Sequence, residues 1–202
     1  MIVPPDAVRE SKNQVIHPAL TRREVEGRPH MMIYLLRHGI AAERSADKYP
    51  DDDLRPLTAR GILRTTEVSR GLVALGLRTT RLWSSPLSRA RNTARLAATV
   101  LGVSEDIIVE SDALRPEKKA AAVLAEIAAA KSETPVMLVG HEPHLTHLAS
   151  LLIAGNEEAA VLTLKKAGLV GIECSFPPAA GRGALQFLLK PGQLAALGAP
   201  PT

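Results

Sequence analysis

From residue 32 onward, the chain alternates short apolar and β-branched runs with segments of helical periodicity. Strands are expected at residues 32–37, 79–84, 106–110, 135–140, 160–165, 168–174 and 184–189. Helices are expected at residues 58–75, 87–101, 117–131, 144–154 and 191–197. This alternation predicts the α/β class, as a three-layer α/β/α sandwich around a mostly parallel central sheet. The last strands follow one another without long helices, so we expect them to add antiparallel edges.

Local signals refine the helix starts. Thr58 and Ser85 are expected as N-caps, and Pro86 suits the first position of the helix that follows. The alanine-rich segment Ala120–Ala130 is a strong helix former that allows close packing.

Residues 1–30 differ from the rest of the chain, because they are polar, contain four prolines and show no sustained period. We expect an N-terminal extension, in part ordered, ahead of a single domain at residues 31–202. Cys174 is the only cysteine, so an intramolecular disulfide is impossible and a reducing, cytoplasmic setting is expected. No apolar run is long enough to cross a bilayer, so no membrane association is expected.

The net charge of +4 raises the question of nucleic-acid binding. The basic residues are scattered, however, and aromatic residues make up only 2% of the chain, so stacking platforms for bases are few. We therefore expect no nucleic-acid partner. Part of the positive charge is expected to lie in a site for anionic substrates.

The first predicted strand ends in Arg37-His38-Gly39, three groups that suit a phosphoryl site. Arginine supplies a planar fork of donors for phosphate oxygens. A neutral histidine can attack phosphorus and hold the phosphoryl group covalently. Glycine lets the backbone approach a charged ligand.

Other chemical groups follow neighbouring strands. Ser85 precedes a helix that carries Arg89 in its first turn, and His141 follows the strand at 135–140. Because the carboxyl ends of parallel strands meet at one edge of a sheet, we expect these groups to lie near His38. Arg55, in the segment before the helix at 58–75, is expected to join them.

Four ordered motifs carry a specific resemblance. They are Leu-Arg-His-Gly, Arg-Pro-Leu-Thr-x-x-Gly, Ser-Ser-Pro-Leu-x-Arg-Ala-x-x-Thr-Ala and Val-Gly-His-Glu-Pro. Together they resemble the histidine phosphatase superfamily, whose fold is phosphoglycerate mutase-like, and within it the short, SixA-type phosphohistidine phosphatases. The similarity runs from about Met32 to Leu189 and includes the late turn Leu164–Gly168.

The resemblance implies a mechanism that the residue chemistry supports. His38 would attack phosphorus in line, and water would hydrolyse the resulting phosphohistidine. Arg37, Arg55 and Arg89, with Gly39, would hold the phosphoryl group. His141 would donate a hydrogen bond to the same oxygens, its protonation favoured by the dianion beside it. No metal or other cofactor is expected, since arginine and histidine supply the charge that magnesium supplies elsewhere.

The proton donor for the leaving group is less defined. Larger members of the superfamily carry a carboxylate for this step, and the candidates here are Glu117 and Glu142. Each also fits a solvated surface charge, as does the run Asp51–Asp53. An alkoxide leaves badly without an acid, whereas imidazole can leave from a phosphoramidate as a neutral molecule. SixA-type members also lack an obvious acid, so a phosphohistidine substrate would agree with the site.

His141, His144 and His147 have a spacing that raises the question of zinc. No further ligand follows at a familiar metal spacing, so packing or the rim of a pocket is the preferred interpretation of His144 and His147. The motifs of P-loop nucleotide hydrolases and serine esterases are absent from the sequence.

The sequence therefore predicts a metal-independent phosphatase, most similar to enzymes that dephosphorylate phosphohistidine on proteins in signal transduction. By resemblance, its partners would be histidine-containing phosphotransfer proteins or a sugar phosphotransferase carrier. A phosphatase of small esters or condensed phosphates with the same core remains an alternative. A catalytically inactive phosphoprotein-binding module is a second alternative, although a binding site needs no nucleophile such as His38. The oligomeric state leaves no readable pattern.

Overall fold

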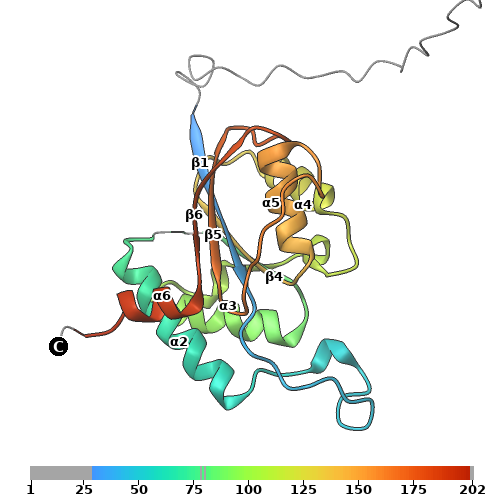
Figure 1. The fold of residues 1–202 in the computed structure, drawn as a ribbon, viewed down its shortest axis with the longest axis vertical. Coiled ribbons are helices and arrows are strands. Elements are labelled where there is room, and N and C mark those ends of the chain that lie inside the picture. Colours follow the sequence, from blue (N-terminus) through green and yellow to red (C-terminus); the bar gives the residue numbers. More distant parts are fainter. Residues whose placement is uncertain (1–28, 78, 80, 201–202) are drawn as a thin grey trace, which may run out of the picture.

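The computed structural model describes residues 29–77, 79 and 81–200, and these form one central sheet with helices on both sides (Figure 1). The strands are β1 (His30–Arg37), β2 (Arg81–Ser84), β3 (Ile108–Glu110), β4 (Val136–Gly140), β5 (Leu169–Ser175) and β6 (Gly183–Leu189). The α-helices are α2 (Ala59–Ala74), α3 (Ser88–Leu101), α4 (Ala120–Ala129), α5 (His144–Ala154) and α6 (Pro191–Leu197). Short 3-10 helices are η1 (Asp52–Leu54), η2 (Glu105–Ile107) and η3 (Asp112–Leu114).

The sheet has the strand order β3-β2-β4-β1-β5-β6. The first four of these strands run parallel, and β5 and β6 add antiparallel pairs beside β1. The predicted fold class, a mostly parallel sheet with late antiparallel strands, is therefore confirmed. Since β4 lies between β1 and β2, the carboxyl ends of these three strands meet at the centre of one sheet edge.

Two apolar cores cover the two faces of the sheet. Ile33 and Leu35 of β1 point to a core that includes residues of α4 and α5. Tyr34 and Leu36, which alternate with them, point to a core formed with α2, α3 and α6. Figure 1 shows the two groups of helices on opposite sides of the strands. This two-sided burial explains why β1 reads as a continuous apolar run.

Two helices, α5 and α6, have the predicted bounds, but one predicted strand is wrong. Residues 160–165 form no strand, although Leu164 is buried. The backbone carbonyl of Leu164 instead accepts a hydrogen bond from Arg37 Nη1 at 2.7 Å, and Val161 points into solvent. The apolar residues of this segment thus pack singly, without joining the sheet.

The start of α3 also differs from the prediction. The helix begins at Ser88 with Leu87 as N-cap, so Pro86 is not helical and Ser85 does not cap the helix. Nearer the start of the chain, β1 begins at His30, which is the last residue of the segment expected as an extension. The remainder of that predicted extension, residues 1–28, lies outside the described residues.

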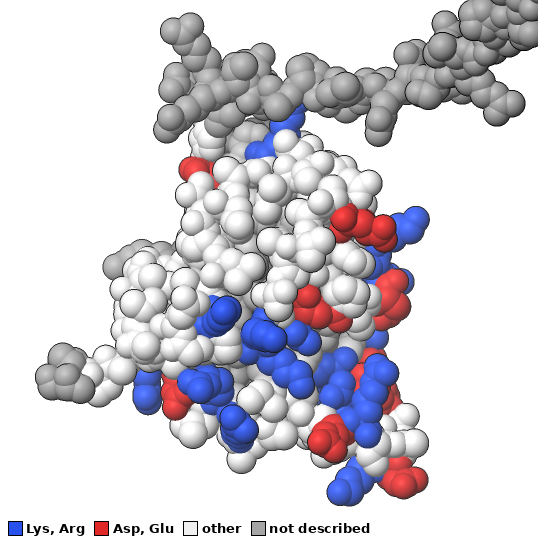
Figure 2. Space-filling model, viewed as in Figure 1, with Lys and Arg blue, Asp and Glu red and all other residues white. Residues whose placement is uncertain are grey.

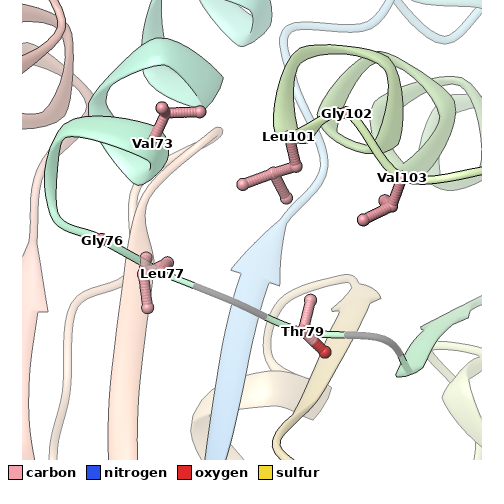
Figure 3. A pocket seen from close by; sticks show the side chains of 7 residues that line it. All are labelled: Val73, Gly76, Leu77, Thr79, Leu101, Gly102 and Val103. Carbon is pink, nitrogen blue, oxygen red and sulfur yellow. The ribbon is translucent and has the colours of Figure 1, made fainter.

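None of the helices in the described ranges is long and apolar enough to span a membrane. A cavity of about 390 Å³ lies where α2 and α3 end and the chain leads into β2 (Figure 3). It is lined mainly by Val73, Leu77, Leu101 and Val103, together with Thr79. The cavity therefore lies toward the amino end of β2, opposite the strand ends that carry the predicted chemistry.

The amino end of α2 is fixed to the loop after β1. Thr58, the predicted N-cap, accepts a hydrogen bond from Gly61 N at 3.0 Å, and its own amide donates to Ile40 O at 2.9 Å. A Cβ on Gly61 would lie 1.9 Å from Ile40 O, so this close approach requires glycine. The Thr-x-x-Gly spacing thus locks the helix to the segment that follows His38.

Gly61→Ala is expected to lower the free energy of unfolding by more than about 2 kcal/mol, because backbone must move to admit the methyl group. Gly192→Ala is the matched control, since a Cβ there meets nothing within 4 Å, and it should change stability by less than about 1 kcal/mol. Chemical denaturation of both variants measures the difference. Equal stability of the two would show that α2 does not depend on this contact.

Candidate active site

The predicted site residues meet at the carboxyl edge of the sheet. His38 directly follows β1 and His141 directly follows β4, and the two rings lie 5.0 Å apart between centroids. The hydrogen bond from His38 N to Gly140 O, 3.0 Å long, continues the parallel pairing of β1 with β4 by one residue. Strand register therefore sets the distance between the two histidines.

Burial and one hydrogen bond keep His38 neutral, with a defined tautomer. Its Nδ1–H donates to the carbonyl of Gly39 at 2.7 Å, which leaves the lone pair on Nε2. Burial lowers the pKa of His38 to about 3, helped by the charges of Arg89, Arg37 and Lys166, while the bond to Gly39 acts in the opposite direction. The imidazole is consequently unprotonated and nucleophilic at neutral pH.

His141 is also buried and neutral. Its Nε2 is hydrogen-bonded to Ser85 Oγ at 2.8 Å, and its Nδ1 is buried without a partner. Burial lowers the pKa of His141 to about 2, and the neighbouring His38 and Arg89 lower it further. With the Ser85 hydroxyl as donor, the ring N–H lies on Nδ1 and can donate to a ligand. The expected protonation of His141 depends on a bound dianion and stays a prediction.

The charges of Arg37 and Arg89 act on His38, and Asp52 links Arg55 to Arg89. Each of these three arginines is partly fixed by the protein. Besides the Arg37 contact with Leu164, Arg55 Nη1 donates to Ala42 O at 2.7 Å. The Arg89 side chain is only 4% exposed, and its Nη1 donates to the backbone carbonyl of Asp52 at 2.9 Å. These contacts orient the guanidinium groups before any ligand arrives.

Three buried donors of this cluster have no partner in the described structure: Arg37 Nε, Arg89 Nε and His141 Nδ1. A buried unpaired donor costs about 1–3 kcal/mol, so such groups call for an acceptor. A phosphoryl group brings three oxygens with the right charge. These donors, near His38, therefore form a candidate receptor for the oxygens of an anion.

Gly39 is closely packed, and its expected contribution to phosphoryl binding stays a prediction. Its amide donates to Thr93 Oγ1 at 3.0 Å and is not free for a phosphate oxygen. A Cβ on Gly39 would lie 2.3 Å from Thr65 Oγ1, so the residue allows α2 to pack closely behind the nucleophile.

The candidate acids lie in distinct surroundings. Glu117 is exposed in the turn before α4, where its charge acts on His144, and no hydrogen bond or ion pair in the described structure links it to His38. Glu142 is half-buried, accepts a hydrogen bond from Thr146 Oγ1 at 2.9 Å and carries a buried Oε1 without a partner. Burial raises the pKa of the Glu142 carboxyl, although Thr146 and Arg37 act against the shift. Of the two, Glu142 lies nearer the site.

His144 and His147 do not join a metal cluster. Across residues 29–77, 79 and 81–200, no group of three or more histidine, cysteine or acidic side chains is arranged to hold an ion. His144 is buried at the start of α5, and His147 lies one turn further along the same helix.

Sequence reasoning missed two charged residues of the site. Asp52, assigned to a solvated run, contacts both Arg55 and Arg89, and only its spacing of three from Arg55 hinted at this. Lys166 lies on a turn whose Ala167 amide donates to the carbonyls of Arg37 and His38, each at 3.1 Å. This turn carries the Lys166 charge close enough to act on His38.

Comparison with known proteins places this geometry in a family. The sequence model described as "Histidine phosphatase superfamily (branch 1)" matches residues 33–116, which include His38, Arg55 and Arg89. A curated relative from Picosynechococcus, an uncharacterized protein, is 41% identical over 145 residues, or 70% of this chain and 84% of its own. The chain belongs to the histidine phosphatase superfamily.

Solved structures with the same fold include SixA-type proteins of this superfamily. A protein histidine phosphatase SixA complexed with tungstate matches with a TM-score of 0.71 and 22% identity, over 81% of this chain and 99% of its own. A candidate phosphohistidine phosphatase SixA from Agrobacterium tumefaciens is 26% identical with a TM-score of 0.65, over 80% and 99%. A mycobacterial glucosyl-3-phosphoglycerate phosphatase matches with a TM-score of 0.57 and 18% identity, over 78% and 97%.

The buried neutral histidines predict how stability depends on pH. Below the ordinary histidine pKa of 6.5, the unfolded chain binds protons that folded His38 and His141 exclude. Stability is therefore greatest above pH 6.5 and falls as the pH drops, by about 2 kcal/mol per buried histidine at pH 5. In His38→Asn, the decrease in the free energy of unfolding between pH 7.5 and pH 5 should be smaller by about that amount, as measured by urea denaturation. An unchanged slope in the variant would mean that folded His38 is protonated at pH 5.

Proposed function

We propose that this superfamily member is a metal-independent phosphatase that forms a phospho-His38 intermediate and acts on phosphohistidine in proteins. Family membership supports phosphatase activity in general. The observation that carries the finer proposal is a neutral, correctly oriented His38 beside three unpaired buried donors.

The reaction needs two displacements at phosphorus. In the first, the Nε2 lone pair of His38 forms a P–N bond while the bond to the leaving group breaks on the opposite side. Arg37, Arg89 and the Nδ1–H of His141 hold the phosphoryl oxygens and stabilise the spread charge. In the second, water attacks phosphorus, His38 regains its lone pair, and inorganic phosphate leaves with the released proton shared with solvent.

The protonation that a leaving group requires indicates which substrates suit this site. No carboxyl group makes a hydrogen bond to His38 or His141 in the described part of the chain. An alcohol would leave as an unstable alkoxide under these conditions. A substrate imidazole that carries a proton on its other nitrogen leaves as a neutral molecule, so a phosphoramidate asks less of this site.

The surface around the site suits a protein substrate with acidic groups. Figure 2 shows Lys and Arg side chains gathered over the lower part of the drawn face, with fewer Asp and Glu side chains among them, where the carboxyl edge of the sheet lies. Such a field raises the encounter rate with an acidic partner. We therefore propose phosphohistidine-bearing proteins as partners, either phosphotransfer proteins of signal transduction or a sugar phosphotransferase carrier.

One observation favours a second candidate function, the hydrolysis of small phosphate esters. The Glu142 carboxyl has a raised pKa and an unpaired Oε1, which are properties of a general acid. Its charge also acts on Arg37, so it lies close to the phosphoryl receptor. Solved structures with this fold include an ester phosphatase, the mycobacterial glucosyl-3-phosphoglycerate phosphatase.

The test compares a phosphohistidine-bearing protein with an alkyl phosphate ester, β-glycerophosphate, without added metal, for wild type and His38→Ala. We expect rapid loss of phosphohistidine, feeble ester hydrolysis, and a loss of at least about 10³-fold in His38→Ala, because the variant lacks the lone pair that accepts the phosphoryl group. Inert phosphohistidine with strong ester turnover would favour the second function, and Glu142→Gln should then abolish that turnover. Ester turnover that survives Glu142→Gln would exclude this carboxyl as the acid.

A further inference from the structure

Asp52 is the one acidic residue in the described structure that joins two arginines of the site. Its Oδ1 accepts a hydrogen bond from Arg55 Nε at 2.9 Å, and its Oδ2 pairs with Arg89 Nη2 at 3.1 Å. Its backbone carbonyl accepts a second bond from Arg89, at Nη1. Arg55 comes from the loop before α2 and Arg89 from α3, so Asp52 connects two separate parts of the fold.

The Asp52 carboxylate offsets the repulsion between positively charged arginines of the site. Arg55 and Arg44 each act on Arg89 as like charges, and Asp52 opposes them. Burial alone would raise the pKa of Asp52, but the hydrogen bond from Arg55 and the charge of Arg89 outweigh it and lower that pKa. Asp52 is therefore ionised at neutral pH and cannot serve as a proton donor.

The carboxylate does not use up the donors of these arginines. Arg89 Nε remains buried and without a partner, and Arg55 Nη2 makes no hydrogen bond in the described structure. A planar guanidinium that is fixed along one edge presents its remaining N–H groups in a fixed direction. Asp52 thus has the geometry to orient both groups while it leaves donors for a ligand.

The 3-10 helix η1, which contains Asp52, makes further contacts of its own. Asp51 accepts a hydrogen bond from Asp53 N at 2.9 Å and so caps η1. Asp53 in turn forms an ion pair of 2.7 Å with Arg115, after η3. Because the side chains of Asp53 and Arg115 are partly exposed, their ion pair contributes little, and the cap from Asp51 is the main local restraint on η1.

We propose that Asp52 is a positioning residue, which sets the spacing of Arg55 and Arg89 to match a single phosphoryl group. It acts through these arginines and does not itself contact the substrate. The inference rests on the proposed function, because it takes the arginine cluster as the phosphoryl receptor. If Asp52 instead competed with phosphate for the arginines, its removal would strengthen anion binding. A positioning role predicts weaker anion binding after its removal, so the direction of the change distinguishes the two roles.

The experiment measures tungstate affinity by calorimetry for wild type, Asp52→Asn and Asp53→Asn. Asp52→Asn keeps the backbone carbonyl but loses the charge that restrains both arginines, so affinity should fall about 10- to 100-fold. Asp53→Asn is the control in the same 3-10 helix, since it breaks only the pair with Arg115, and it should stay within about twofold of wild type. Equal or tighter binding by Asp52→Asn would overturn the proposal. Absence of binding by wild type would instead count against the receptor itself.

A double variant distinguishes positioning from a general loss of structure. If Asp52 acts through Arg89, adding Asp52→Asn to Arg89→Ala should weaken tungstate binding by much less than it does in wild type. Fully additive losses in the double variant would mean that Asp52 acts independently of Arg89, contrary to the proposal. Thermal unfolding of each variant, followed alongside, shows whether any loss tracks stability.

Discussion

The parallel pairing of β1 with β4 is the constraint on which the candidate site depends. It continues past the end of β1 through the bond from His38 N to Gly140 O, so both histidines leave the sheet at the same level. Ser85 joins from β2, whose pairing with β4 extends in the same manner through the bond from Ser85 N to Val139 O. The receptor is therefore built on the central strands. β1 supplies Arg37, the loop before α2 supplies Arg55 and α3 supplies Arg89.

Charge and burial then act together. Low solvation keeps the two histidines neutral in a cluster of cations, and this gives His38 a free lone pair at neutral pH. The same cations would repel one another without Asp52, which binds Arg55 and Arg89 from outside the receptor. An incoming phosphoryl dianion adds the charge and the acceptors that the empty cluster lacks. The site is thus prepared for an anion before the anion binds.

Features that depend on local pattern could be predicted from sequence. The strand ends that carry His38 and His141 follow from apolar runs, and the expected antiparallel edge follows from the absence of intervening helices. Features that depend on which of several partners a polar group binds could not be predicted from sequence. Ser85 forms a hydrogen bond with His141 and does not cap α3. The carbonyl of Leu164 accepts a hydrogen bond from Arg37 and does not pair with a neighbouring strand. Asp52 was missed for the same reason, because three adjacent acidic residues look alike until the fold brings arginines to one of them.

The proposed chemistry requires that neutral His38 takes the phosphoryl group. Rapid quenching of the enzyme with a ³²P-labelled phosphohistidine protein, followed by peptide mapping, tests it most directly. We expect an acid-labile, alkali-stable label on the peptide that contains His38, formed and lost at least as fast as turnover. Wild-type turnover with no label on that peptide, or label on a different residue, would contradict it.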